Sequence, residues 1–455
     1  MKNKNMSPTN PPIDLHLIEF KFPRVYRHTL SNGLPLLIIE HHEIPKVYFR
    51  IGYDFGSKDD PSGKAGLNLI LSTTIKKGTK SKDYYTIVEK IEELGGELDS
   101  VASEDFFFVQ GEFLKEHAEK GLDILRDIIQ NPVFPKEHLE KERFKQIADL
   151  ENEKSSPEFL AQRRLDNSLF AAHPYGVHKT MASLKSISRD DLVNFHGSFF
   201  SSTLALLVVA GDISRNKAIN LTEKFFVNMP YLPDRDRKPY LLNQTRKRFI
   251  HIVNRPESQQ VNILMGNLSF KRNHPDYEKT AVMSKILGGG GSGRLFLDLR
   301  EKKGYTYGAY TSLLSYKEAG AFITNTEVRN EVVLAALDSV FEQFEKIKQE
   351  PVSEQELQHA RQYLIGVFPL QNETASSIAA LTLKQHLYAL PENYWDEYLE
   401  KISMVNMDDV QSMAHKYIRS EEMTMVLVGD ANLLLNKVGP YGPVSVYDLD
   451  DNPVN

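Results

Sequence analysis

The sequence contains two similar halves. Residues 187–212 and 405–430 align without a gap; each carries an Asp-Asp pair near its start and ends in Gly-Asp, and the two stretches lie 218 residues apart. Upstream, Arg143 and Arg361 match at the same separation of 218 residues. Similarity at one fixed separation indicates repeated structural units. The sequence therefore predicts two homologous halves of about 200 residues each.

A segment rich in proline and charge separates the halves. Residues 232–246 have the composition of a linker. We therefore expect an N-terminal half at 15–231 and a C-terminal half at 247–437. The two ends are expected to be tails, with residues 1–14 as a mobile N-terminal tail and residues 438–455 as an acidic C-terminal tail.

Strand and helix patterns alternate within each half. Residues 26–40 read as two strand-like runs around an Asn-Gly pair, which is a strong hairpin signal. Apolar residues alternate along 47–53, as in a half-buried strand. Apolar residues at helical spacing predict helices in three places, after Asp83, from about 118 and from about 136. We therefore predict an α+β fold of two homologous two-layer α/β halves, each a sheet with helices packed on one face.

The composition excludes several classes of protein. The 455 residues include no Cys, which removes thiol nucleophiles, disulfides and thiolate metal sites. The chain has 55 basic and 61 acidic residues, and the basic residues are not concentrated in one stripe. Nucleic acid is therefore not an expected partner. The longest apolar run, 204–210, is too short for a membrane span. No apolar stretch follows the first lysines, so we expect the cytoplasm rather than the periplasm.

Recognisable motifs occur in a fixed order along the chain. They are SNGLPLLII, GLNLILSTTIKKGT, EELGGELDS, HPYG at 173–176, GGGGSGRLFLDLREKKGYTYGAY and the repeated Gly-Asp. In this order they resemble the pitrilysin/insulinase family of metallopeptidases, the inverted zincins, and their relatives, the mitochondrial processing peptidase subunits and the respiratory core proteins. The resemblance covers about residues 25–437. It implies a duplicated fold with the two halves arranged as a clamshell.

The resemblance also identifies the positions of the family's zinc site. Members bind zinc through H-x-x-E-H on a helix and a second Glu downstream. Here the two His positions are Leu69 and Thr73, the Glu position is Ser72, and the downstream ligand falls at Asp149. A catalytic zinc needs about three protein ligands, so we expect no metal and no cofactor in this chain. Leu69 predicts that the pocket is refilled as hydrophobic core. His residues elsewhere, including His173 of HPYG, are interpreted as hydrogen-bonded or solvated side chains.

The second half retains a pair of polar residues. In related zinc peptidases an Arg and a Tyr seven positions later hold the substrate carbonyl and stabilise the oxyanion, and these positions match Arg300 and Tyr307. The residues alone favour a structural role, because Arg suits a helix C-terminus and Tyr suits a strand. The resemblance favours the catalytic role, as substrate-carbonyl and transition-state contacts.

Substrate-binding residues are expected beside this pair. Tyr305 is predicted to add a second aromatic ring on the same strand face as Tyr307. Gly289 and Gly290 belong to a glycine run that is associated with substrate handling in the processing-peptidase relatives. A plain flexible connection explains this run about as well, and no Lys-Ser/Thr follows it as a phosphate loop requires.

Two functions follow from these features. In the first, the chain is the non-zinc subunit of a heterodimeric peptidase and is not active alone. A paralogous partner with intact H-x-x-E-H, or else a second copy, completes the site, zinc is bound in the partner, and peptides are the substrates. In the second, the chain is an inactive scaffold or peptide-binding protein, like the respiratory core subunits. A zinc peptidase active on its own would need ligands that the sequence does not supply.

Overall fold

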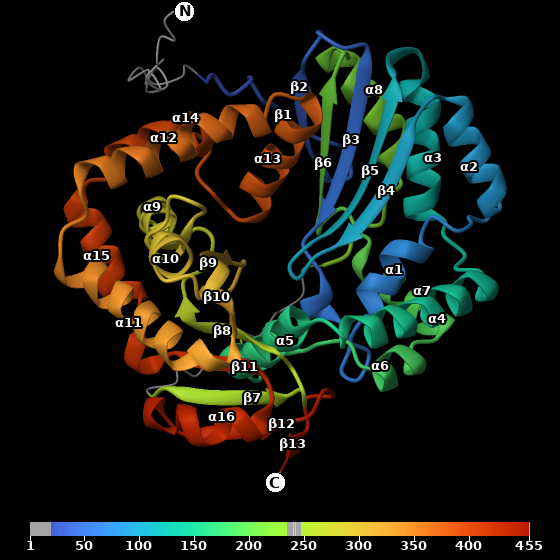
Figure 1. Cartoon of the computed structure of the whole chain (residues 1–455). Helices are drawn as coiled ribbons and strands as arrows, with labels where there is room; N and C mark the ends of the chain where they lie inside the picture. Colours follow the sequence, from blue (N-terminus) through green and yellow to red (C-terminus); the bar gives the residue numbers. More distant parts are fainter. Residues whose placement is uncertain (1–19, 234–239, 241, 243–246, 455) are drawn as a thin grey trace, which may run out of the picture.

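The chain folds into two halves, each built on one mixed β-sheet (Figure 1). The computed structural model describes residues 20–233, 240, 242 and 247–454. The first sheet has six strands in the order β1-β2-β6-β3-β5-β4, and the second has seven in the order β13-β12-β7-β11-β8-β10-β9. Helices cover both sheets, which confirms the predicted α+β class.

The strands of the first sheet are antiparallel except for the parallel pair β2–β6. Their bounds are β1 Tyr26–Thr29, β2 Pro35–Glu40, β3 Lys46–Tyr53, β4 Glu97–Ala102, β5 Phe107–Leu114 and β6 Ala205–Gly211.

Five strands of the second sheet, β7-β11-β8-β10-β9, repeat this pattern, with β7–β11 as the parallel pair equivalent to β2–β6; β12 also pairs in parallel with β7. Its bounds are β7 Phe249–Asn254, β8 Gln260–Ser269, β9 Thr306–Ser315, β10 Gly320–Arg329, β11 Thr424–Gly429, β12 Val444–Tyr447 and β13 Pro453–Val454.

Helices follow the strands in a similar order in both halves. In the first half they are α1 Leu67–Thr74, α2 Tyr84–Glu93, α3 Ala118–Gln130, α4 Lys136–Glu153, α5 Pro157–Phe170, α6 Met181–Ser186, α7 Arg189–Phe199 and α8 Arg215–Phe226. In the second half they are α9 Tyr277–Gly288, α10 Arg294–Phe296, α11 Val333–Gln349, α12 Glu354–Gln371, α13 Ala375–Leu387, α14 Tyr394–Met404, α15 Met407–Tyr417 and α16 Ala431–Val438.

The repeated residues make the same contacts in both halves. The second residue of each Asp-Asp pair, Asp191 or Asp409, closes a capping box at the start of α7 or α15. The Arg143 side chain donates to the carbonyl of Ile187, and Arg361 donates to that of Val405. The repeat therefore preserves helix caps and the arginine that anchors the segment before each cap.

Both sheets bury apolar side chains on two faces. On one face of the first sheet, Phe49 and Val209 pack under helices of the same half. On the other face, Val208 packs against Ile378 and Leu383 of α13, which belongs to the second half. The prediction of helices on one face therefore describes only part of the packing.

A helix of the first half covers the second sheet in return. Leu165 and Phe170 of α5 pack against Leu264 of β8 and Val428 of β11. The starts of α5 and α13 lie 218 residues apart, so these are equivalent helices of the repeat. Each half thus closes the inner sheet face of the other (Figure 1).

The C-terminal segment differs from the expected tail at 438–455. Strand β12 pairs in parallel with β7, and β13 pairs with β12. The Arg164 guanidinium forms an ion pair with Asp451 at 3.2 Å, and Asn167 donates to the same carboxylate at 2.6 Å. The segment therefore extends the second sheet and holds α5 in place, because its alternating Val-Ser-Val-Tyr sequence forms a short strand.

The remaining sequence expectations fall at the ends of the halves. The expected N-terminal tail, 1–14, lies outside the described residues, as does most of the expected linker, 232–246. Within the described ranges, no helix is both long and apolar enough to cross a membrane.

Replacement of Leu383 by Ala tests the packing of α13, a helix of the second half, against the first sheet. Leu383 is buried in the core between α13 and the first sheet, and its side chain lies against Gly52 of β3. We expect Leu383→Ala to lower the free energy of unfolding by about 2–5 kcal/mol, measured by urea denaturation. Leu370→Ala, at a position 70% exposed on α12, is the control. Equal stability of the two variants would contradict this account of the packing.

Candidate functional site

The positions that correspond to the family's zinc ligands lie on helices α1 and α4. Ser72 and Thr73 both direct their hydroxyls back onto their own helix: Ser72 Oγ donates to the carbonyl of Leu69 at 2.8 Å, and Thr73 Oγ1 donates to that of Ile70 at 2.9 Å. Asp149 lies half-buried on α4, which packs beside α1. One carboxylate and two hydroxyls already bonded to the backbone do not provide a zinc ligand set.

The rest of the described structure agrees with this reading. Among the residues it describes, no group of three or more His, Asp or Glu side chains could hold a metal ion. The expectation that Leu69 is part of a refilled core is wrong, because Leu69 is only half-buried while its neighbours Leu67, Ile70 and Leu71 are fully buried. Leu69 is therefore less buried than the apolar residues of α1 that form the core of the first half.

Arg300 and Tyr307 lie on neighbouring elements of the second half. Arg300 lies in a π-helical turn, Leu297–Lys302, where its guanidinium lies 4.8 Å from the Phe296 ring centre and 3.7 Å from Glu301. Tyr307 lies on β9, the edge strand of the second sheet, and is 85% exposed. Both side chains are accessible to a ligand, and their catalytic role stays a prediction.

Tyr305 does not share the environment of Tyr307. It precedes β9 and packs against the hydrophobic core of the second half. A register shift opposite Thr326 and Val328 interrupts the pairing of β9 with β10. Such irregularities break the simple alternation of side chains along a strand, which explains why the spacing of two residues does not place both rings on one face.

The glycine run forms the end of α9 and the turn after it. Gly290 has a φ of +126°, and the Lys285 ammonium donates to the carbonyl of Gly289. A Cβ at Gly288 would lie 2.6 Å from the backbone nitrogen of Thr311, so close packing against β9 requires glycine there. Gly291 lines a pocket of about 430 Å³ together with His359 of α12. Packing explains part of this run, and substrate binding by Gly289 and Gly290 stays a prediction.

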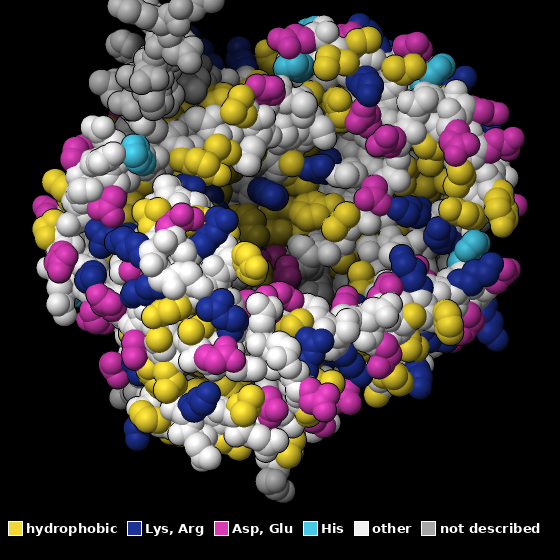
Figure 2. Space-filling model, in the orientation of Figure 1, with side chains coloured by type: hydrophobic (Ala, Val, Ile, Leu, Met, Phe, Trp, Pro, Cys, Tyr) yellow, Lys and Arg dark blue, Asp and Glu magenta, His cyan; other side chains and the backbone are white. Residues whose placement is uncertain are grey.

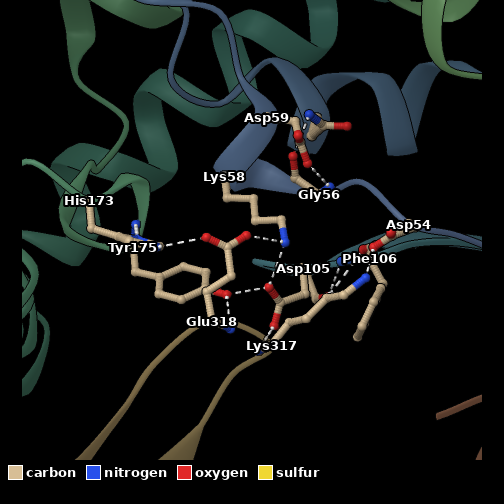
Figure 3. A network of polar contacts seen from close by, with 12 residues as sticks. Asp54, Gly56, Lys58, Asp59, Asp105, Phe106, His173, Tyr175, Lys317 and Glu318 are labelled. Atoms are coloured by element: carbon tan, nitrogen blue, oxygen red, sulfur yellow. Dashed lines mark hydrogen bonds and ion pairs between the residues drawn. The ribbon is translucent and has the colours of Figure 1, made fainter. Parts of the chain in front are cut away.

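A buried polar network joins the two halves at the turn between β9 and β10 (Figure 3). Lys58 Nζ donates to Asp105 Oδ1 at 3.1 Å and to Glu318 Oε1 at 3.0 Å, and the side chains of Lys58 and Asp105 are only 3% and 1% exposed. The backbone nitrogen of Lys317 donates to the other Asp105 oxygen at 2.7 Å. Lys58 and Asp105 belong to the first half and Glu318 to the second, so the network fixes the position of this turn.

The HPYG motif supplies the other side of the network. His173 is buried, its Nδ1 accepts from the backbone nitrogen of Tyr175 at 3.1 Å, and its Nε2 lies 3.2 Å from Glu318 Oε2. With Nδ1 as acceptor, Nε2 carries the proton and donates to Glu318. The Tyr175 hydroxyl donates to Asp105. The prediction of a hydrogen-bonded His173 is confirmed.

These contacts set the charges of the network. The hydrogen bond from His173 is the main cause that lowers the pKa of Glu318 to about 2; burial opposes it, and Lys58 adds to it. Burial acts against the charge of Lys58, but Asp105 and Glu318 outweigh it and raise the pKa of Lys58. Sequence reasoning missed Lys58, Asp105 and Glu318, because each lies in a short connection with no periodic pattern.

Comparison with known proteins agrees with the fold and the missing ligands. The family described as Insulinase (Peptidase family M16) matches residues 36–182, and the family described as Peptidase M16 inactive domain matches residues 186–364. The "Uncharacterized zinc protease YmxG" of Bacillus subtilis is 22% identical over 406 residues, which are 89% of this chain and 98% of that protein. The "Non-peptidase homolog YmxG" of Helicobacter pylori is 24% identical over 413 residues, 87% of this chain and 92% of that protein.

Solved structures share the same fold. A crystal structure of a peptidase M16 inactive domain from Pseudomonas fluorescens has a TM-score of 0.83 and 24% sequence identity, covering 89% of this chain and 98% of that one. A protease from Helicobacter pylori also has a TM-score of 0.83, with 19% identity over 89% of this chain and 99% of that one.

The network predicts a pH-dependent contribution to stability. The pKa of Glu318 is lower in the folded chain than its ordinary value of 4.5. Ionised Glu318 therefore stabilises the fold fully above about pH 4.5, and this stabilisation is lost as the pH falls toward 2. We expect Glu318→Gln to lower the free energy of unfolding by about 1–2 kcal/mol at neutral pH, allowing for its partial exposure. By urea denaturation the difference from wild type shrinks below about pH 5. Glu373→Gln, on an exposed loop, is the control, and a difference independent of pH would contradict the prediction.

Proposed function

We propose, since the chain belongs to the insulinase family of peptidases (M16), that it is the subunit without zinc in a two-chain peptidase that cleaves peptides. The observation that carries the proposal is a contrast between the two halves. The first half has Leu, Ser and Thr where the family has its metal ligands and general base, whereas the second half keeps Arg300 and an 85% exposed Tyr307.

The retained residues have a definite chemical use. A guanidinium offers a fixed fork of donors and a phenol offers one directional donor, and both suit a peptide carbonyl that gains negative charge during hydrolysis. The partner, with an intact H-x-x-E-H, would bind zinc and supply the general base. A partner chain fits this better than a second copy, because a second copy would lack the same ligands.

A second function is a peptide-holding protein with no part in catalysis. The name of the Helicobacter pylori relative, "Non-peptidase homolog", supports it, as does the position of the Arg300 guanidinium, which already lies against Phe296 and near Glu301. In that case the chain holds peptides without cleaving them.

Native purification separates these functions. The chain is isolated through a tag, co-purifying proteins are identified, and zinc is measured per complex. A second chain with H-x-x-E-H and about one zinc per pair supports the two-chain peptidase. A pure preparation without zinc or such a partner would leave the peptide-holding function.

Substitution of Tyr307 tests its role in that complex. We expect Tyr307→Phe to lower kcat/KM for peptide hydrolysis by about 10²-fold, the usual effect of losing one oxyanion donor, while assembly is unchanged by size-exclusion chromatography. Arg300→Ala should have a similar effect. The matched control is Tyr85→Phe on α2, where the ring is 74% exposed. If Tyr307→Phe cleaves peptides at the wild-type rate, the assigned role is wrong.

A further inference from the structure

Two cationic side chains meet where the first sheet contacts the exchanged helix α13. Arg50 lies on β3 between Phe49 and Ile51, which both point into the core of the first half, so Arg50 lies on the opposite face, toward α13. Lys384 follows Leu383, which packs against Gly52 on that same face of β3. Arg50 and Lys384 therefore come from different halves and lie on one inner surface.

Neither cation has a carboxylate partner in the part of the chain that the structure describes. Within residues 20–233 and 247–454, no carboxylate forms an ion pair with Arg50 or Lys384. Burial first, and then the charges of Arg50 and Arg272, lower the pKa of Lys384, and burial lowers that of Arg50. Two like charges that are partly removed from water repel each other, so an anion placed between them would be stabilised by both.

The third cation of this region is already compensated. Arg272 Nη2 donates to the Tyr394 hydroxyl at 2.8 Å, and that hydroxyl donates to the buried carboxylate of Glu278 at 2.5 Å. Arg272 also lies over the Tyr277 ring at 3.7 Å. Arg272 is thus paired, whereas among the described residues no ion pair is found for Arg50 or Lys384.

A pocket beside Arg50 has room for part of a peptide. Its volume is about 510 Å³, and its walls come from β3, β4, β5 and α2 of the first half and from Ser376 and Ala379 of α13. Figure 2 shows that the surface between the halves is hollowed, with Lys and Arg side chains inside the hollow. Two of the carboxylates that line the pocket, Glu112 and Asp99, are already paired with Lys46 and Lys76.

We propose that Arg50 and Lys384 bind a carboxylate of a peptide where β3 meets α13, beside the pocket that Arg50 lines. The Arg fork can hold a carboxylate through two parallel hydrogen bonds, and Lys adds a point charge. The carboxylate is an acidic side chain or the C-terminal group of the peptide. The further carboxylates at the rim, Glu92 and Glu97, would repel a polyanion such as a nucleic acid. The inference takes only its ligand class, peptides, from the proposed function.

Binding of three matched peptides to the purified full-length chain tests the inference. The peptides are fluorescein-labelled and equal in length: one has a central Glu and a free C-terminus, one has Gln in place of Glu, and one has an amidated C-terminus. We expect removal of one of the two carboxylates to weaken binding about tenfold in fluorescence anisotropy, as for loss of a charged hydrogen bond. The group whose removal weakens binding identifies the source of the carboxylate. The preference should diminish in about 0.5 M salt.

Variants assign the effect to the two cations. Arg50→Gln and Lys384→Gln should each abolish the preference while binding the peptide that lacks the recognised carboxylate as before, and Arg50→Lys should retain part of it. Lys346→Gln, on the exposed part of α11 and paired with Glu342, is the control and should leave all affinities unchanged. Melting temperatures close to wild type show that each variant is folded.

The results separate this inference from the proposed function. Equal affinities for all three peptides, a preference that survives Arg50→Gln and Lys384→Gln, or no binding by the chain with or without its co-purified partner would overturn the inference. Peptide cleavage by a zinc-bearing complex with no charge preference would overturn it too, while leaving the two-chain peptidase intact. A charge preference without any catalytic partner would support the inference and remove the proposed function.

Discussion

The burial of α5 and α13 against the sheet of the opposite half is the interaction on which the rest of the structure depends. Without α13, the first sheet would expose Leu37, Val208 and Ala210, and without α5 the second would expose Leu264 and Val428. Burial of apolar surface stabilises a fold by about 25 cal/mol per Å². Exposing these side chains to water would therefore destabilise each sheet, so each half depends on the other. The exchange makes the two halves one body and leaves a hollow between them as its inner surface (Figure 2).

The buried polar network fixes the position of the β9–β10 turn against the first half, which apolar contact alone does not specify. Burying charges is costly unless they are paired and hydrogen-bonded, and Lys58, Asp105 and Glu318 satisfy one another across the halves. The turn that carries Glu318 connects β10 to β9, the strand of Tyr307. The network therefore anchors the turn of this hairpin to the first half, while Tyr307 lies near the opposite end of β9.

Sequence patterns predicted what local interactions determine. The first hairpin and the helix that begins after Asp83 follow from short-range hydrogen bonds and turn chemistry. The exchange of α5 and α13 could not be predicted this way, because an apolar helix face does not specify which sheet it covers. Leu69 was misjudged for a related reason: residue type suggested burial, but position on α1 decides it. The strand at Val444–Tyr447 was missed because four alternating residues give a weak signal.

The polar side chains between the two halves differ in whether the described structure gives them a partner. Ser72, Thr73 and His173 have hydrogen-bond partners, and the buried charges at the junction are paired. Within the described residues Arg50 and Lys384 have no ion pair, and Tyr307 extends from β9, the edge strand of the second sheet. A fold leaves such groups unpaired only where water or a ligand can reach them. Arg50 and Lys384 come from different halves, so a peptide carboxylate bound by both would contact the two halves at once.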